Sequence, residues 1–130
     1  MDGAQLLELA MRTAAGLPAV THEHPFGPEY EVFKVVGKVF LLVTEAPGEA
    51  VVTLKCEPEH GTALQQRYAE VVPGYYLDKR HWVTIRAGGA VTRELVDELV
   101  RNSYELVVAG LPRARRPTGA RPSSGGPGDA

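Results

Sequence analysis

The sequence predicts an α+β domain in which an antiparallel sheet carries its helices mainly on one face. Apolar residues recur at helical spacing near both ends of the domain, and between them lie short strands rich in β-branched residues. The expected order is helix, three strands, helix, two strands, helix. At 130 residues, with 44% hydrophobic and 23% charged residues, the chain is long enough for one core.

The first helix is expected to start at Asp2 and to stop at Gly16 and Pro18. Asp2 and Gln5 have the spacing of a capping box. One face of this helix carries Leu6, Leu7, Ala10, Met11 and Ala14. The following segment, THEHPFGP, lacks periodicity and contains two prolines and a glycine, so an irregular connection is predicted there.

Residues 30–36 and 39–43 are expected to form a hairpin, because both are rich in β-branched and aromatic residues. Only Gly37 and Lys38 separate them, which indicates a tight turn with glycine at its first position. Residues 51–54 supply a third strand after a Pro-Gly turn. Three strands with short links predict an antiparallel meander.

A short second helix is predicted over residues 60–68, with Pro58 suited to the first helical position. Residues 71–76 read as an extended piece, but they contain a proline and a glycine, which favours irregular structure or a sheet edge. Residues 81–87 are expected to form the fifth strand. These elements complete the sheet.

The last helix is expected to begin after Thr92, whose hydroxyl suits the N-cap position. Val91 and Val96 stand at the two positions of a hydrophobic staple. The helix carries a broad apolar stripe and a charged outer face that is expected to be solvated. The single domain is predicted to cover residues 1–111.

Residues 112–130 are predicted to be a disordered tail, because they are almost entirely Pro, Gly, Ser, Ala and Arg. The last twenty residues hold four of the 14 basic and one of the 16 acidic residues, which leaves a net charge of −5 on the body. Such a body is unfavourable for non-specific DNA binding. A solubilising tail is the favoured interpretation, and the weaker alternative is phosphate contact by Arg113, Arg115 and Arg116.

Cys56 is the single cysteine, so neither an intrachain disulfide nor a multi-cysteine metal site is possible. No stretch approaches the roughly 20 apolar residues needed to span a bilayer, and the N-terminus does not resemble a leader. These observations predict a cytoplasmic protein without a membrane partner.

The sequence offers little for catalysis. The run His22, Glu23 and His24 consists of residue types that can bind metals. No second cluster of matched spacing follows, so a surface loop is favoured over a metal site. Cys56 stands at the end of an expected strand and reads as a core residue. No glycine-rich phosphate motif is present. We therefore expect no catalytic residue, cofactor or metal, and no enzymatic activity.

The segment over residues 72–85, VPGYYLDKRHWVTI, combines three aromatic rings with two adjacent cations and a histidine. Basic residues among aromatic ones can hold phosphates and stack on bases. The candidates for this role are Lys79, Arg80, His81 and Trp82.

The alternative interpretation of the same segment is structural. Asp78 and Lys79 would make a hairpin turn, while Tyr75, Tyr76 and Trp82 would fill the sheet. Residue types alone favour this alternative slightly.

Four runs of the sequence carry a resemblance to a known family: HPFGPEYEVFKVVGKVF, LKCEPE, PGYYLDKRHW and ELVRNSYELVVAGLP. In this order they resemble the MmcQ/YjbR family of small bacterial proteins, over about residues 5–112. The resemblance implies a fold similar to secretion-chaperone-like and CyaY-like domains. It also departs at Glu57, where many relatives would have aspartate, which weakens the predicted helix cap.

Families of this type are labelled DNA-binding because their paired hairpins look like a double wing. The resemblance therefore implies phosphate contacts from the segment at residues 79–82 and from Lys34 and Lys38 in the first hairpin. Two functions stay open. One is a DNA-binding module without catalytic activity, and the other is a protein-interaction or adaptor domain that uses an exposed sheet edge or groove. Either would act as a monomer or a weak dimer.

Overall fold

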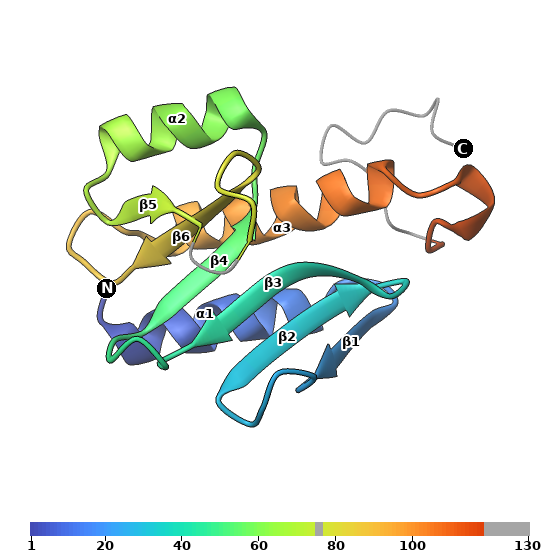
Figure 1. The fold of residues 1–130 in the computed structure, drawn as a ribbon, viewed down its shortest axis with the longest axis horizontal. Coiled ribbons are helices and arrows are strands. Elements are labelled where there is room, and N and C mark those ends of the chain that lie inside the picture. The colour runs from blue at the N-terminus through green and yellow to red at the C-terminus, as the bar shows by residue number, and fades with distance from the viewer. Residues whose placement is uncertain (75–76, 119–130) are drawn as a thin grey trace.

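The protein is described here by a computed structural model that defines residues 1–74 and 77–118. It contains three α-helices, a short 3-10 helix and one six-stranded sheet (Figure 1). In chain order the elements are α1 (Gly3–Ala15), β1 (Val20–Glu23), β2 (Tyr30–Val35), β3 (Lys38–Thr44), β4 (Val51–Lys55), α2 (Pro58–Arg67), β5 (Val71–Pro73), β6 (Trp82–Arg86), α3 (Arg93–Ala109) and η1 (Arg113–Arg115). The predicted α+β class is confirmed.

The strands lie in the order β1-β2-β3-β4-β6-β5, and every neighbouring pair is antiparallel. Strand β1 (Val20–Glu23) was not predicted, and the irregular connection expected over residues 21–28 is wrong for residues 21–23. Thr21, His22 and Glu23 place polar groups on both faces of this edge strand, so no apolar alternation marks it. Its pairing with β2, from Val20 opposite Val35 onward, determines its conformation.

The turn between β2 and β3 lies one residue earlier than predicted. Val36 and Gly37 occupy its two central positions with φ angles of 48° and 76°. This combination matches a hairpin turn that needs positive φ at both positions, so glycine stands second. Val36 is strained there as a β-branched residue, but its side chain packs against the core.

All three helices contribute to one core cluster on a single face of the sheet, which we call the helical face. Its largest fully buried side chains include Leu6, Phe33, Phe40, Leu41, Leu54, Ile85 and Leu99. Helices α1 and α3 pack on each other behind the sheet, and α2 lies beside β5 (Figure 1). A Cβ added at Gly61 of α2 would meet the side chain of Val83 at 3.2 Å, which explains the glycine.

Two predicted helix starts are confirmed. The Asp2 carboxylate accepts from the backbone of Gln5, and the Gln5 side chain completes the capping box. The Thr92 hydroxyl accepts from the Leu95 backbone N–H. Helix α2 begins at Pro58, which occupies the first helical position as expected. The N-cap residue Glu57 makes no side-chain cap hydrogen bond.

A β-bulge in β3 is linked to α3 by one buried serine. Phe33 pairs with Leu41 and Lys34 with Val39, which leaves Phe40 as the extra residue. The Ser103 hydroxyl donates to the Phe40 carbonyl at 2.6 Å and accepts from the Lys55 backbone N–H at 2.8 Å. Ser103 therefore holds the bulge, β4 and α3 together.

The chain keeps regular structure past the predicted domain boundary. Beyond α3, the Arg116 side chain donates to the carbonyls of Ala109 and Leu111 at 3.0 and 3.1 Å and so caps the helix end. The described part of the predicted tail contains the 3-10 helix η1, and the disorder expected over residues 112–130 stays a prediction. Residues 119–130, with Arg121 among them, lie outside the described residues, as do Tyr75 and Tyr76.

Within the described ranges, no helix has both the length and the apolar character needed to cross a bilayer.

Candidate functional site

The face of the sheet opposite the helices, here called the open face, contains the row Val32, Leu42, Thr53 and Thr84 across four paired strands. Side chains alternate along a strand, so these residues point away from their core neighbours. All four are nevertheless less than 5% exposed. The hydroxyls of Thr53 and Thr84 lie 2.7 Å apart in a hydrogen bond. These residues of the open face are thus buried, although no helix in the described part of the chain lies on it.

An apolar pocket of about 380 Å³ lies on this face. Among the described residues, it is lined by Phe26, Tyr30, Val39, Leu42 and Leu77. The β1–β2 loop and the β5–β6 loop each contribute one wall, and strands β2 and β3 form the floor. Phe26 is 62% exposed, which is unusual for a phenylalanine and leaves much of this residue accessible to a ligand. The pocket suits a flat apolar or aromatic group.

The cationic turn of the β5–β6 loop is held by Asp78. The His81 backbone N–H donates to the Asp78 carbonyl, which closes a β-turn over residues 78–81. The Asp78 carboxylate also accepts from His81 Nδ1 at 2.7 Å and from the Arg80 backbone N–H at 2.9 Å. These hydrogen bonds, the one from His81 first, lower the pKa of Asp78. Lys79 and Arg80 are left exposed on the turn.

The structure brings the predicted cations to one end of the sheet. Because neighbouring strands are antiparallel, the ends of β2 and β4 lie beside the starts of β3 and β6. We call this region the basic end, and it consists of Lys34, Lys38, Lys55, Lys79 and Arg80. Trp82, the first residue of β6, pairs with Lys55 and is partly buried.

Two members of the basic end differ from expectation. Lys34 is only 22% exposed and pairs with Glu23 at 3.1 Å, so part of its charge is already neutralised. Lys55 was missed by sequence reasoning, because nothing near it in the sequence is basic. Its position at the end of a strand that neighbours β6 was the available signal.

Acidic residues are distributed unevenly. The opposite end of the sheet has a carboxylate beside each of four strands, at Glu29, Glu45, Glu49 and Glu70. The basic end has Asp78, which faces His81, together with Glu57 and Glu59 at the start of α2. The net charge of −5 on the body therefore does not describe its local surfaces.

The tail arginines at residues 113, 115 and 116 differ in their contacts. Arg113 and Arg115 are exposed in the 3-10 helix η1, whereas Arg116 is engaged by the end of α3. Of the three predicted phosphate contacts, Arg116 thus has a structural role.

Cys56 lies in the core, as predicted, and is 1% exposed. Its Sγ lies 3.4 Å from Nδ1 of His60. Burial, with the nearby Glu57 charge as a second cause, raises the pKa of the Cys56 thiol to about 11. A protonated, enclosed thiol is a poor nucleophile.

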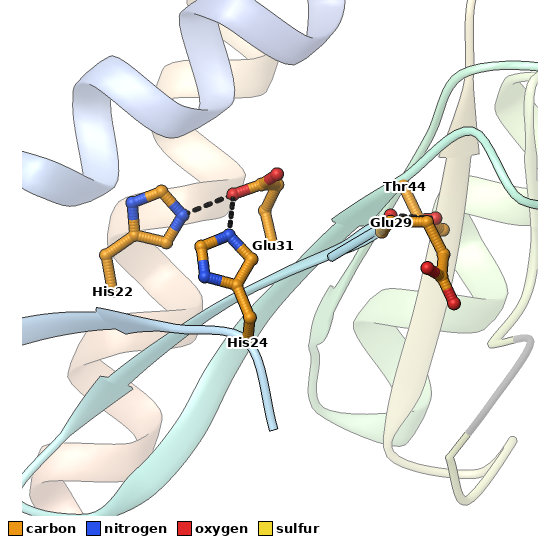
Figure 2. Close-up of polar contacts among 5 residues, drawn as sticks. All are labelled: His22, His24, Glu29, Glu31 and Thr44. Atoms are coloured by element: carbon orange, nitrogen blue, oxygen red, sulfur yellow. Dashed lines mark hydrogen bonds and ion pairs between the residues drawn. The ribbon is translucent and has the colours of Figure 1, made fainter. Parts of the chain in front are cut away.

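The two histidines expected in a surface loop form a compact cluster with Glu31 (Figure 2). His22 Nε2 lies 2.6 Å and His24 Nε2 lies 2.7 Å from the same carboxylate oxygen of Glu31. Burial raises the pKa of Glu31, but the hydrogen bonds from His22 and His24 outweigh it and the pKa is lowered. Sequence spacing pointed to Glu23 as the neighbouring carboxylate, whereas Glu23 binds Thr21 and Lys34 instead.

Comparison with known proteins identifies the family. The YjbR family model matches residues 15–106. The chain belongs to the YjbR family. The Escherichia coli O157:H7 protein YbdF is 40% identical over 111 residues, which cover 85% of this chain and 91% of YbdF. The YjbR protein of Escherichia coli K12 is 34% identical over 83 residues, 64% of this chain and 70% of that protein.

Solved structures support the same family fold. The crystal structure of a Deinococcus radiodurans protein with the domain DUF419 superposes with a TM-score of 0.75 at 34% identity, covering 88% of this chain and 90% of that one. A Pseudomonas syringae protein superposes with a TM-score of 0.65 at 23% identity, covering 82% and 98%, and shows the fold alone.

Two of the four sequence runs that carry the YjbR resemblance meet on the open face. HPFGPEYEVFKVVGKVF supplies Phe26, β2 and the β2–β3 turn, and PGYYLDKRHW supplies Leu77 and the cationic turn. Segments about fifty residues apart in the chain thus form the two walls of one pocket.

Proposed function

We propose that this YjbR domain binds single-stranded DNA on its open face and carries out no catalysis there. The observation that carries the proposal is that one loop both lines the apolar pocket on the open face and carries two cations of the basic end. Leu77 lines the pocket, while Lys79 and Arg80 follow it on the same loop. One ligand with an aromatic part and a phosphate part would engage both.

The expected division of roles follows from the chemistry of each part. A base would enter between Phe26 and Leu77 and stack on an aromatic ring, an interaction worth about 1–3 kcal/mol per base. The phosphates beside it would contact Lys79 and Arg80, with Lys38 and Lys55 as further contacts. The paired hairpins β2–β3 and β5–β6 would act as the two wings that the family label implies.

The charge distribution supports a short, oriented contact. The carboxylates at the opposite end of the sheet, of which Glu49 is paired with Arg86 at 3.1 Å, would repel the DNA backbone, so the phosphates would lie at the basic end. Each phosphate neutralised on a single strand contributes about −0.7 to the slope of log affinity against log salt. Removing both Lys79 and Arg80 should therefore reduce the slope by about 1.4.

The test is a salt-titrated anisotropy assay with labelled single-stranded and duplex DNA. It compares the full chain, a chain ending at Thr118 and the variant Lys79→Ala/Arg80→Ala. The matched control is Arg12→Ala/Arg93→Ala, which removes two exposed cations from α1 and α3. We expect loss of affinity and a smaller salt slope in the first variant only. Equal affinity in both variants would contradict the assignment of the site.

A second candidate, a protein-interaction or adaptor domain, is favoured by one specific observation. The described residues that line the pocket are all aliphatic or aromatic, and Phe26 is largely exposed. An apolar side chain of a partner peptide would fit the same place. The fold similarity to secretion-chaperone-like and CyaY-like domains, which the resemblance implies, would suit this role.

The DNA-binding and adaptor functions can be distinguished by comparing ligand binding in two variants. Phe26→Ser should weaken either ligand, whereas Lys79→Ala/Arg80→Ala should weaken only a phosphate-bearing ligand. Binding that is insensitive to salt and to the cation variant, but is lost in Phe26→Ser, would support the adaptor role.

We also propose that the protein acts in the cytoplasm, as a monomer or weak dimer. A single cysteine suits a reducing compartment. Fractionation of cells and sedimentation of the purified chain test these two statements.

A further inference from the structure

The cluster of His22, His24 and Glu31 has the composition of a metal site, and no step of DNA binding uses it. His22 lies in β1, His24 follows that strand directly, and Glu31 lies in β2. The ladder pairs His22 with Phe33 and Glu23 with Val32, so its next step places His24 opposite Glu31. Residues two apart on a strand share a face, which brings both imidazoles to one carboxylate.

The ligand atoms already converge. The nearest nitrogen or oxygen atoms of the three side chains all lie within 4.8 Å of one another. A tetrahedral zinc ion with bonds of about 2.1 Å separates its ligand atoms by about 3.4 Å. The two Nε2 atoms lie 2.6 and 2.7 Å from the Glu31 oxygen, so these two separations must grow by about 0.7–0.8 Å when an ion enters.

One ligand is held rigidly before any ion arrives. The His22 ring stacks on Phe33 with a centroid distance of 4.2 Å and an interplanar angle of 18°. Phe33 is 1% exposed and belongs to the core, so it fixes the imidazole plane. Preorganised ligands lose less conformational entropy on binding. Side-chain exposures of 43% for His22, 46% for His24 and 29% for Glu31 leave a path for the ion.

We propose that His22, His24 and Glu31 bind one divalent transition-metal ion of the zinc class and leave at least one coordination position open. Two imidazoles and a carboxylate are a ligand set that zinc accepts, with a fourth position for water or another ligand. Hard oxygen-seeking ions such as Mg²⁺ are disfavoured by two nitrogen ligands. The ion would replace two hydrogen bonds by stronger bonds to the same atoms.

The neighbouring carboxylates do not complete the set. Glu23 points to the other face of the strand, where it binds Thr21 and Lys34. The Glu29 side chain points away from the histidines in Figure 2, although it lies only two residues before Glu31. The site also differs from the DNA surface, because Glu31 and Phe33 alternate with the open-face residue Val32.

The experiment is a titration of the tag-free full chain with Zn²⁺ by calorimetry and with Co²⁺ by visible absorption. We expect one ion per chain and, for Co²⁺, a spectrum typical of low coordination number. His24→Ala and Glu31→Gln should each weaken binding about 100-fold or more, because removing even an outer-shell partner costs 10–100-fold. His22→Ala is avoided, since it also removes the contact with Phe33.

Two matched variants serve as controls. Glu29→Gln neutralises a nearby carboxylate outside the cluster, and His60→Ala removes the histidine beside Cys56. Both should bind as the unaltered chain does. Thermal unfolding without metal shows whether each variant folds; if Glu31→Gln does not, the half-exposed His24 decides the result.

The proposal is overturned if the unaltered chain takes up no stoichiometric ion, or if His24→Ala and Glu31→Gln bind as tightly as it does. Loss of binding in His60→Ala alone would place the ion at Cys56 instead. Because the readout is metal uptake, failure of DNA binding would leave this result unaffected.

Discussion

The helical face and the open face of the sheet cover their buried residues by different means. On the helical face, side chains from α1, α2 and α3 interlock with Phe33, Leu41 and their neighbours in one continuous cluster. On the open face, the buried Thr53 and Thr84 bond to each other, and residues of two loops line a pocket of about 380 Å³. Side chains that pack against helices contribute mainly to the stability of the fold, whereas a face bordered by loops retains room for a ligand.

Substitutions of two phenylalanines test this contrast, and they should differ most in the free energy of unfolding. Phe40 is fully buried and packs edge-on against Tyr104 at 5.4 Å, whereas Phe26 is 62% exposed beside the pocket. Phe40→Ala should lower the free energy of unfolding by about 3–5 kcal/mol. Phe26→Ala should change it by less than about 0.5 kcal/mol.

Urea unfolding measures both free energies of unfolding. Phe26→Ala should instead weaken ligand binding. A large destabilisation by Phe26→Ala would mean that the open face is a second core, and the contrast between the faces would fail.

The helical face also depends on one polar residue, Ser103, which joins α3 to β3 and β4. Ser103→Ala leaves the Phe40 carbonyl and the Lys55 N–H without the partner they have in the structure. We expect a loss of about 2–4 kcal/mol, since each buried unsatisfied group costs about 1–3 kcal/mol.

The control for Ser103 is Thr62→Ala in α2, whose exposed hydroxyl donates to the Pro58 carbonyl. It should change stability by less than about 0.5 kcal/mol. If both variants lose the same amount, the hydroxyl of Ser103 does not hold the bulge.

Cys56 reports on how tightly the helical face is closed. Its pKa of about 11 keeps the thiolate fraction at pH 8 about 100-fold below that of an ordinary cysteine, and burial blocks access as well. Alkylation at pH 8 should therefore be at least about 100-fold slower in the folded chain than in urea.

The pH dependence of alkylation follows from the raised pKa. The folded-state rate should rise with pH up to about 11, while the unfolded-state rate levels off near pH 9. Rapid labelling of the folded chain at pH 8 would show that the core opens around α2.

Much of this architecture was predictable from sequence, because local signals and tertiary packing agree. The cap at Asp2, the cap at Thr92 and the staple of Val91 and Val96 are local patterns, and each helix starts where they indicate. The cationic loop was also found, since its residues are adjacent in the chain.

The missed features depend on contacts between distant segments. Strand β1 has no apolar alternation, and only its pairing with β2 defines it. Without β1, the approach of Glu31 to His22 and His24 could not be predicted, because nine residues separate Glu31 from His22. Lys55 joined the basic end for the same reason, through the position of β4 beside β6.

The smallest expected effect concerns α2, the helix of the helical face that starts without a side-chain cap. Glu57 has extended backbone angles suited to an N-cap, but its side chain makes no cap hydrogen bond. Glu57→Asp shortens the side chain to the length that reaches the N2 or N3 amide, so it should stabilise the fold by about 0.5–1 kcal/mol. Glu59→Asp inside the first turn is the charge-matched control and should give no gain. A gain from both variants would show that the shorter side chain stabilises the first turn in general, whereas a gain from Glu57→Asp alone would show that the missing cap hydrogen bond at residue 57 limits the stability of α2.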